Sequence, residues 1–522
     1  MKPVTTPIAQ QRLLKAATLF LRADSRPNVG LGHIARSLGL AEAWQRRNGT
    51  VHIVVDPDES GLVDPRIVSL IDSLGLAAPR LAGPGPAAGL TEMIGTDANV
   101  WIVLDGYDYT ADVQTSVRDL GRLLVVDDHC SLGSYDADLV LDQNPDTHAF
   151  HYRGVEPGNV LRGEQFTTLR STAFDAEALT AAPDSAVAFL AGGSPSEQTQ
   201  QVLRAAIVRL KTRVPVRVIA MPWIDDPDVE HRPFTSTLVD ALHGVSCVVA
   251  PSGATAWELC ALGVPSVLFA VAANQLPVGK TVEDAGAGTF AGSLWAEPPD
   301  GIAAHIADAA SIFHEDRDVR ERASIRGRKL IDGRGADRVL THVLSERLDL
   351  DRVSWSHVDL LFEWANDPIV RASAFNSAQI TRDEHELWLS GRLERNGDRN
   401  QHWIAHLDAQ PIGQIRFDHR ESIWEVSVTL DEAARGRGLG SAVIAAGTRQ
   451  LANALGESHT VIAQVKAANL ASMKAFLAAG YKLLGYRRSD SSTPLGSVEV
   501  ADAETAPDET LVAQLQWDGA GS

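Results

Sequence analysis

Residues 435–440 carry the clearest chemistry in this sequence. They read Arg-Gly-Arg-Gly-Leu-Gly, follow a predicted strand and open a predicted helix. Glycines let the backbone approach a ligand closely, and the first amides of a helix point toward an anion. The two arginines and the positive helix end add charge complementarity. We predict a pyrophosphate-binding loop here, although the same residues would also suit a glycine-rich turn that caps a helix.

The segment resembles the pyrophosphate motif of the GNAT acetyltransferase superfamily, Q/R-x-x-G-x-G/A, with Arg435, Gly438 and Gly440 at the motif positions. The resemblance covers roughly 352–488. It implies that a free amine attacks the thioester of acetyl-CoA, which would be the co-substrate. The cofactor-binding residues that it implies are Arg435, Gly436, Arg437, Gly438, Gly440, Asn469 and Ser472.

A second part of this resemblance begins with Asn469 at a predicted helix start and ends at Tyr481. In the family this asparagine lies near the pantetheine arm, whereas its simpler role would be an N-cap. Many members have a tyrosine seven residues after the asparagine, as the acid for the leaving thiolate, but Phe476 stands there in this chain. Tyr481 or water would have to replace it, or the thiolate leaves unassisted.

The strand before the loop carries Glu425 and Ser427, which point to the same face because strand residues alternate. The family often places a base or a water relay on this strand, so the resemblance makes Glu425 a candidate base. A pair of solvent-facing polar residues fits the pattern equally well. His385 and Trp388 further resemble the members that acetylate amino sugars or protein N-termini.

A separate constellation near the N-terminus centres on His33. The segment 30–36 reads Gly-Leu-Gly-His-Ile-Ala-Arg and follows a strand that ends at Arg22 and Asp24. An imidazole is neutral and basic near pH 7. The segment lies at the carboxyl end of the first parallel strand, where α/β sheets place ligands. A histidine at a helix start can also simply cap the helix.

More polar or glycine-rich turns follow the later strands, at 105–107, 127–129, 191–194, 251–258 and 274–275. Each of these turns alone could be a loop or a helix cap. Because the carboxyl ends of parallel strands share one edge of a sheet, we expect the turns to face a common cleft between two lobes.

This set resembles the UDP-2,4-diacetamido-2,4,6-trideoxy-β-L-altropyranose hydrolase family of pseudaminic acid biosynthesis, which has the two-lobed fold of GT-B glycosyltransferases. The resemblance spans roughly 18–345. It implies that His33 activates the attacking water, that Asp24 and Tyr107 belong to the same catalytic site, and that the second lobe holds UDP. The family's D-H-Y turn is Asp-Gly-Tyr here. The implied substrate- or UDP-binding residues are Arg22, Gly30, Gly32, Arg36, Gly192, Gly193, Ser194, Ser252, Gly253, Thr255, Glu258, Asn274 and Gln275, with Glu258 a candidate for the ribose hydroxyls.

The helices and strands expected to position these residues show two different sequence patterns. Short apolar runs alternate with helical patterns over 18–141 and again over 186–270, which predicts two parallel sheets covered by helices. After an exposed boundary at 345–352, an antiparallel meander, helices and a last strand at 511–517 follow. The predicted fold is α/β, with two Rossmann-like lobes in a GT-B-like arrangement followed by an α+β GNAT domain. The predicted domains are 1–180, 181–346 and 352–517, with a mobile polar loop at 489–508.

Composition limits the partners. The formal net charge of -20 over 522 residues disfavours nucleic acid and anionic membranes as partners. The three cysteines show no metal-binding spacing, so no metal is expected, and their low number fits a cytoplasmic protein. No apolar run approaches a membrane span. The sequence leaves the oligomeric state open.

The two resemblances together predict a bifunctional enzyme. In the pathway of the hydrolase family, N4-acetylation of a UDP-amino sugar directly precedes removal of UDP, so the two activities would be consecutive steps on one substrate. Two alternatives remain open: a GT-B glycosyltransferase that uses an acceptor other than water, and a catalytically silent nucleotide-sugar binding module that presents substrate to the acetyltransferase.

Overall fold

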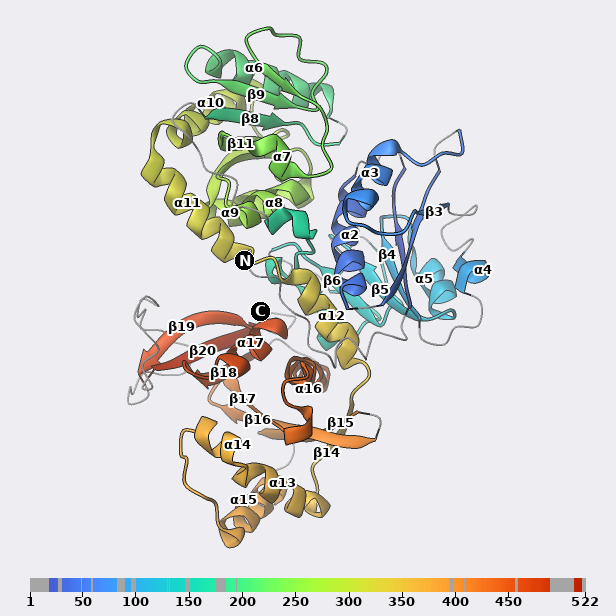
Figure 1. The fold of residues 1–522 in the computed structure, drawn as a ribbon, viewed down its shortest axis with the longest axis vertical. Helices are drawn as coiled ribbons and strands as arrows, with labels where there is room; N and C mark the ends of the chain where they lie inside the picture. The colour runs from blue at the N-terminus through green and yellow to red at the C-terminus, as the bar shows by residue number, and fades with distance from the viewer. Residues whose placement is uncertain are drawn as a thin grey trace. The chain divides into compact units, whose positions relative to one another are not determined.

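The computed structural model describes residues 18–26, 31–47, 49–57, 60–81, 90–94, 100–128, 130, 132–145, 151–174, 185–193, 195–394, 399–407, 409–455, 459–488 and 511–518 (Figure 1). These residues divide into two compact units. The N-terminal unit comprises Ala17–Val155 and Leu161–Ala336, and the C-terminal unit comprises Asp337–Ser522 together with Glu156–Val160. The predicted loop 489–508 and residue Gly30, like Ser194, lie outside the described residues.

The first lobe of the N-terminal unit is a seven-stranded sheet in the order β3-β2-β1-β4-β5-β6-β7. The paired strands from β3 to β6 are parallel, and β4 is buried along its whole length, as the apolar runs predict. Because β1 lies between β2 and β4, the winding of the chain reverses between β1 and β4, and such a reversal opens a crevice at the carboxyl edge. The elements are β1 (Thr18–Ala23), α2 (Gly32–Gln45), β2 (Thr50–Val55), α3 (Pro65–Ser73), β3 (Arg80–Leu81), α4 (Leu90–Ile94), β4 (Val100–Asp105), α5 (Ala111–Arg118), β5 (Arg122–Val126), β6 (Leu139–Asp142) and β7 (Val160–Arg162).

The second lobe repeats this topology with six strands in the order β10-β9-β8-β11-β12-β13, all paired in parallel. Its winding reverses between β8 and β11. The elements are β8 (Ala186–Leu190), α6 (Glu197–Leu210), β9 (Val216–Ile219), β10 (Glu230–Arg232), α7 (Leu238–Leu242), β11 (Val245–Pro251), α8 (Ala254–Leu262), β12 (Ser266–Ala270), α9 (Leu276–Asp284), β13 (Gly288–Ser293), α10 (Pro299–Glu315) and α11 (Arg317–Leu330).

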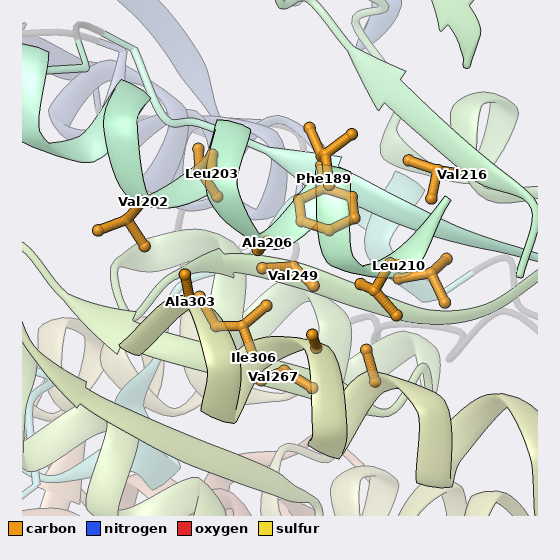
Figure 2. Packing of buried hydrophobic residues seen from close by; sticks show 14 of the residues in the cluster. Phe189, Val202, Leu203, Ala206, Leu210, Val216, Val249, Val267, Ala303 and Ile306 are labelled. Atoms are coloured by element: carbon orange, nitrogen blue, oxygen red, sulfur yellow. The ribbon is translucent and has the colours of Figure 1, made fainter. Parts of the chain in front are cut away.

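Helices cover both faces of this second sheet. Phe189 and Val249 pack on one face against Leu203 of α6 and Ile306 of α10, as Figure 2 shows. Their strand neighbours point the other way and pack with α7, α8 and α9. The alternation explains why the strands are apolar on both faces, and it confirms the predicted Rossmann-like architecture.

The C-terminal unit is built on a third, mixed sheet in the order β14-β15-β16-β17-β18-β20-β19. Only β17 and β18 pair in parallel among its described neighbours. The last strand, β20, returns to the sheet as predicted, and it lies between β18 and β19. The elements are α12 (Gly335–Ser345), β14 (Asp349–Arg352), α13 (Val358–Asn366), α14 (Pro368–Ser373), α15 (Arg382–Glu394), β15 (Asn400–Leu407), β16 (Gln410–Arg420), β17 (Ile423–Leu430), α16 (Leu439–Leu455), β18 (Thr460–Lys466), α17 (Leu470–Ala478), β19 (Lys482–Arg488) and β20 (Leu511–Asp518).

The two faces of this third sheet carry different helices. Ile415 of β16 meets α16 so closely that a side chain at Gly447 would lie 2.6 Å from it. Ile404 of β15 packs on the opposite face with Leu361 of α13 and Leu389 of α15. One face therefore holds α16, and the other holds the α13–α15 layer.

The start of the C-terminal unit differs from the expected exposed boundary at 345–352. Residues 349–352 form the edge strand β14, paired antiparallel with β15. The unit already begins at Asp337, inside α12. Arg338 Nε donates to the Leu477 carbonyl oxygen at 2.8 Å, and His342 Nε2 lies 3.3 Å from the Ala479 carbonyl oxygen. The domain limits inferred from the sequence stay predictions, and these contacts assign α12 to the C-terminal unit.

We predict that a fragment starting at residue 337 is more stable than one starting at 347. The shorter fragment loses the hydrogen bonds of Arg338 and His342, which we expect to lower its Tm by about 5–10 °C, since each bond contributes about 1 kcal/mol. Differential scanning calorimetry of both fragments measures the difference. Equal Tm values would show that α12 adds nothing to this unit.

Candidate functional site

A histidine–aspartate pair lies at the reversal point of the first sheet. His33 follows β1 at the start of α2, and Asp105 is the last residue of the adjacent strand β4. His33 Nδ1 is 2.6 Å from Asp105 Oδ1, and both residues are buried. A carboxylate oxygen can only accept, so this short contact assigns the proton to Nδ1 and leaves Nε2 as the basic atom. His33 does not cap α2, because the N-cap position is Leu31.

The Asp105 carboxylate is held by further donors. Arg36 donates to it through Nε at 2.8 Å and Nη2 at 2.6 Å, and Ser37 Oγ donates at 2.7 Å. Burial alone would raise the pKa of Asp105, but Arg36 and His33 outweigh it and hold that pKa far below its usual value. Asp105 therefore stays ionised and can orient His33 throughout the physiological range.

Tyr107 and Asp128 complete this cluster. The Tyr107 ring stands edge-on to His33, with ring centroids 4.8 Å apart and an angle of 85° between the planes. Its hydroxyl donates to Asp128 Oδ2 at 3.4 Å, and Asp128 also forms an ion pair with Arg36. Burial and the Asp128 charge raise the pKa of Tyr107 to about 12, so its phenol is protonated at neutral pH. We call His33, Arg36, Asp105, Tyr107 and Asp128 the His33 cluster.

Two predicted residues beside β1 have other partners. Arg22 donates to both oxygens of Asp56, at 3.0 and 2.5 Å. Asp24 accepts from Arg26 at 2.9 and 2.5 Å, and its side chain makes no bond to His33. These ion pairs give Arg22 and Asp24 a structural role in the strand end. Gly32, the first residue of α2, has open space where a side chain would be.

Sequence reasoning placed Asp105 in a turn and did not assign it to His33. The signal that could have found it is the strand order. In a doubly wound sheet the strand beside β1 ends level with it, and Ala23 indeed pairs with Asp105. A histidine that follows β1 is therefore expected to lie beside a polar side chain at the end of β4.

The equivalent edge of the second lobe brings together predicted residues from β8, β11 and β12. Gly192 after β8 has a φ of +81°, a conformation that glycine adopts without strain. A side chain at Gly253, the N-cap residue of α8, would lie 3.6 Å from Gln275 Nε2, which places Gln275 beside the start of α8. Gly193, Thr255 and Asn274 lie along the same edge, with Thr255 and Asn274 half-buried.

Two other residues predicted to bind UDP make contacts inside the N-terminal unit. Ser252 is fully buried, and its Oγ donates to the Phe269 carbonyl oxygen at 3.2 Å. Glu258 forms an ion pair with Arg170 at 2.9 Å, which occupies one of its carboxylate oxygens. Ser252 therefore supports the edge, and Glu258 is held against Arg170.

In the C-terminal unit, the glycine loop 435–440 runs directly into α16. Gly436 and Gly438 have φ values of +68° and +75°, so both need glycine for their backbone conformation. Arg435 Nε donates to the Leu430 carbonyl oxygen at 3.1 Å, and Nη1 lies 2.9 Å from Asp367 Oδ1. Arg435 thus fixes the loop from inside, while Arg437 is exposed.

The loop packs on its surroundings at Gly440. A Cβ there would lie 3.4 Å from Leu430 Cδ1 and 3.6 Å from Ala475 Cβ, which leaves room for little more than a methyl group. This space fits the G/A alternative of the motif.

Other residues of the predicted acetyl-transfer site are engaged with neighbours. Glu425 accepts from Arg420 Nε at 2.6 Å and from Gln464 Nε2 at 2.7 Å. Asn469 accepts from the Ser472 amide at 3.1 Å and is the N-cap of α17, the simpler of its two predicted roles.

Tyr481 lies inside the unit. It is 1% exposed, and its hydroxyl lies 2.8 Å from Thr448 Oγ1 of α16. Burial raises the pKa of Tyr481. A buried, bonded hydroxyl with a raised pKa is a poor proton donor to a thiolate that arrives from solvent, so the geometry disfavours the acid role that the sequence suggested for Tyr481.

Comparison with known proteins decides the nature of this unit. Residues 347–482 match the family model described as the acetyltransferase (GNAT) domain. The C-terminal unit contains a GNAT acetyltransferase domain. No curated protein matches the chain.

Three of the solved structures similar to the chain are described as acetyltransferases. Spermidine N-acetyltransferase from Vibrio cholerae is 12% identical, with 33% of this chain and 96% of that chain covered and a TM-score of 0.27. A phosphinothricin acetyltransferase from Sinorhizobium meliloti is 16% identical, with 34% and 91% covered and a TM-score of 0.27. Ribosomal-protein-alanine N-acetyltransferase from Brucella melitensis is 16% identical, with 32% and 98% covered and a TM-score of 0.26.

The described residues also bear on membranes and metals. None of the helices in the described ranges is both long and apolar enough to cross a membrane. Among those same residues, no group of three or more His, Cys, Asp or Glu side chains is placed to hold a metal ion.

We predict that Asp105→Asn destabilises the N-terminal unit by about 3–5 kcal/mol at pH 7, because it leaves the buried Arg36 charge poorly compensated. The depressed pKa of Asp105 stabilises the folded state above the unfolded pKa, about 4, and this contribution is lost as the pH falls further. Urea unfolding of wild type and variant at pH 7 and pH 3 should therefore show a smaller difference at pH 3. Asp108→Asn, which removes an exposed partner of Arg26, is the matched control and should change stability by less than about 1 kcal/mol. A pH-independent difference would contradict the ionised Asp105.

Proposed function

We propose that the protein is a bifunctional nucleotide-sugar enzyme of pseudaminic or related nonulosonic acid biosynthesis. Its GNAT domain acetylates the free amine of a UDP-amino-dideoxy sugar with acetyl-CoA, and its N-terminal unit hydrolyses the resulting UDP-diacetamido-trideoxy sugar. The observation that carries the hydrolytic half is the His33–Asp105 pair at the reversal point of a doubly wound sheet, where such folds bind ligands.

Hydrolysis needs a base and a stabilised leaving group. The basic Nε2 of His33 takes a proton from water while the water oxygen attacks the anomeric carbon. The bond between that carbon and the diphosphate oxygen breaks, and UDP leaves with the electron pair. Asp105 stabilises the charged imidazole that forms, and the Tyr107 ring, edge-on to His33, lines the same site.

The second lobe suits the UDP portion. Gly192, Gly193 and Gly253 line the carboxyl edge where the winding reverses, and the amides of the first turn of α8 can receive the diphosphate. Gln275 beside this helix start is a candidate for a polar contact to the nucleotide.

Acetyl transfer uses the glycine loop of the C-terminal unit. The left-handed Gly436 and Gly438 open the backbone toward an anion, and α16 begins immediately behind them, so the loop fits the pyrophosphate of acetyl-CoA. The acceptor amine attacks the thioester carbonyl carbon, the carbon–sulfur bond breaks and CoA leaves as the thiolate. Glu425 or water takes the proton from the amine.

One experiment tests both halves. The full chain is incubated with a panel of UDP-amino sugars and acetyl-CoA, and both the acetylated and the UDP-free products are followed by mass spectrometry. Acetylation followed by water-dependent UDP release is expected. Release only in the presence of an added sugar acceptor would identify a glycosyltransferase, and acetylation with no release at all would identify a silent binding module.

We predict that His33→Gln lowers the rate of UDP release by about 10²–10⁴-fold, since a positioned general base contributes that much. Acetyl transfer, UDP-sugar affinity and Tm should change little, because Gln keeps a similar size and hydrogen-bonding capacity. His52→Gln, a half-buried histidine of β2, is the control and should retain turnover. Normal turnover of His33→Gln would reject the base assignment.

We predict that Gly438→Val weakens acetyl-CoA binding at least about tenfold. A β-branched residue strains a backbone with a φ of +75° and obstructs the approach of the pyrophosphate. Isothermal calorimetry gives the Kd, and UDP release by the same sample should stay intact. Gly244→Val introduces similar strain at a φ of +68° in the N-terminal unit and serves as control. Unchanged acetyl-CoA affinity in Gly438→Val would move the cofactor site elsewhere.

A further inference from the structure

Arg416 of β16 is a cation for which the described residues provide no hydrogen-bond acceptor. Its Nε is buried and has no hydrogen-bond partner, and the nearest carboxylate oxygen, Asp418 Oδ2, lies 3.9 Å away. The side chain is 34% exposed, so the end of the guanidinium group reaches solvent.

The position of Arg416 follows from strand alternation. Ile415 and Phe417 point to the α16 face, where Phe417 meets Trp403. Arg416 points to the opposite face, under α15, where its guanidinium carbon lies 5.4 Å from the centre of the Trp388 ring. Trp388 therefore holds the guanidinium group through a cation–π contact.

Arg392 of α15 reinforces the positive charge at this place. Its guanidinium carbon lies 5.6 Å from the centre of the same Trp388 ring, and its Nη1 donates to Asp418 at 2.5 Å. Arg392 is only 6% exposed, and its Nε and Nη2 have no hydrogen-bond partner among the residues that the structure describes. Such unpaired buried donors each cost free energy, which an incoming acceptor group would recover.

The charges on this stretch of the sheet do not balance. Among the described residues of this stretch, Arg392 pairs with Asp418 and Arg420 pairs with Glu425 at 2.6 Å. Arg416 shares Asp418 at 3.9 Å, so three cations face two carboxylates. Burial lowers the pKa of the neighbouring His402 to about 3, so His402 is neutral. The local excess is positive in a chain whose net charge is -20.

Arg416 lies next to the residues that are candidates for the proton transfer. It pairs directly with Ser427 across the antiparallel β16–β17 ladder, and the next pair on the same face is Asp418 with Glu425. Directly paired residues have Cβ atoms about 4.5–5.5 Å apart. An anion bound by Arg416 would therefore lie close enough to Ser427 and Glu425 for a single sugar ring to carry both the anion and the reacting amine.

We propose that the acetyl acceptor carries an anionic group, phosphate or carboxylate, and that Arg416, held against Trp388 and supported by Arg392, binds it. This inference rests on the proposed acetyl transfer and deepens it, because it names the charge of the acceptor and the residue that selects for it. It requires neither UDP nor the hydrolytic activity. A polyamine acceptor, which is cationic, is disfavoured by the same charge.

The test compares a matched pair of amines, glucosamine 6-phosphate and glucosamine, together with the UDP-amino sugars, on the full chain. CoA release gives kcat and KM. Wild type should prefer the phosphorylated amine, and Arg416→Gln should lose about 10- to 100-fold in kcat/KM for anionic acceptors, mainly through KM. Activity with glucosamine should change less than about twofold, and Arg416→Lys should restore part of the preference.

The control is Arg382→Gln on the same helix as Trp388. Arg382 also stacks on an aromatic ring, that of Phe362, and also pairs with carboxylates, but it lies outside this cluster. Its loss should leave the preference unchanged. Calorimetry with inorganic pyrophosphate, on the full chain saturated with CoA, gives a readout that needs no turnover: the binding that depends on Arg416 should weaken about tenfold in Arg416→Gln.

The outcomes separate this inference from the proposed function. The role of Arg416 is overturned if wild type and Arg416→Gln show the same preference between the two amines, or the same affinity for pyrophosphate. Either result leaves the acetyltransferase assignment intact. If no UDP-amino sugar is acetylated but Arg416 still selects the phosphorylated amine or binds pyrophosphate, the inference stands and the UDP-sugar function fails.

Discussion

Asp105 is a fully buried carboxylate that receives hydrogen bonds from His33, Arg36 and Ser37. A buried charge is tolerated only when donors surround it, and here those donors come from the helix that follows the neighbouring strand. The same set of bonds fixes the tautomer of His33, holds the start of α2 on the sheet and ties Arg36 to Asp128. One carboxylate at the end of β4 therefore organises the whole His33 cluster.

The acetyltransferase unit uses the opposite arrangement. On its sheet face under α15, Arg392 and Arg420 each pair with a carboxylate, whereas Arg416 lies 3.9 Å from the nearest carboxylate oxygen. The one carboxylate near Arg416 among the described residues, Asp418, lies 3.9 Å away and also pairs with Arg392, so the Arg416 charge is poorly compensated, which is why we propose an acceptor with a negative charge. The two proposals thus rest on basic groups that internal charges position: the Nε2 of His33 in one unit and Arg416 in the other.

Much of the architecture could be predicted because it depends on local pattern. The apolar runs at β1, β4 and β11 are long and bounded by turn residues, so strand positions followed directly. The glycine loop before α16 was recognisable from its spacing together with its place between a strand and a helix. The edge strand β14 was missed because its four residues are mostly polar and exposed, and only pairing with β15 makes them a strand. The assignment of α12 to the C-terminal unit was missed for the same reason, since it depends on contacts with Leu477 and Ala479, far away in sequence.

The sequence by itself determined the residue types that can do chemistry: a histidine after β1, glycines that allow positive φ at 436 and 438, and a GNAT motif at 435–440. Only the tertiary structure decided their partners. It joined His33 to Asp105, turned Asp24 and Arg22 toward structural ion pairs, and buried Tyr481 against Thr448. The physical reason is range: backbone conformation and periodicity are local properties of the chain, whereas the pairing of charges depends on which strand ends the fold brings side by side.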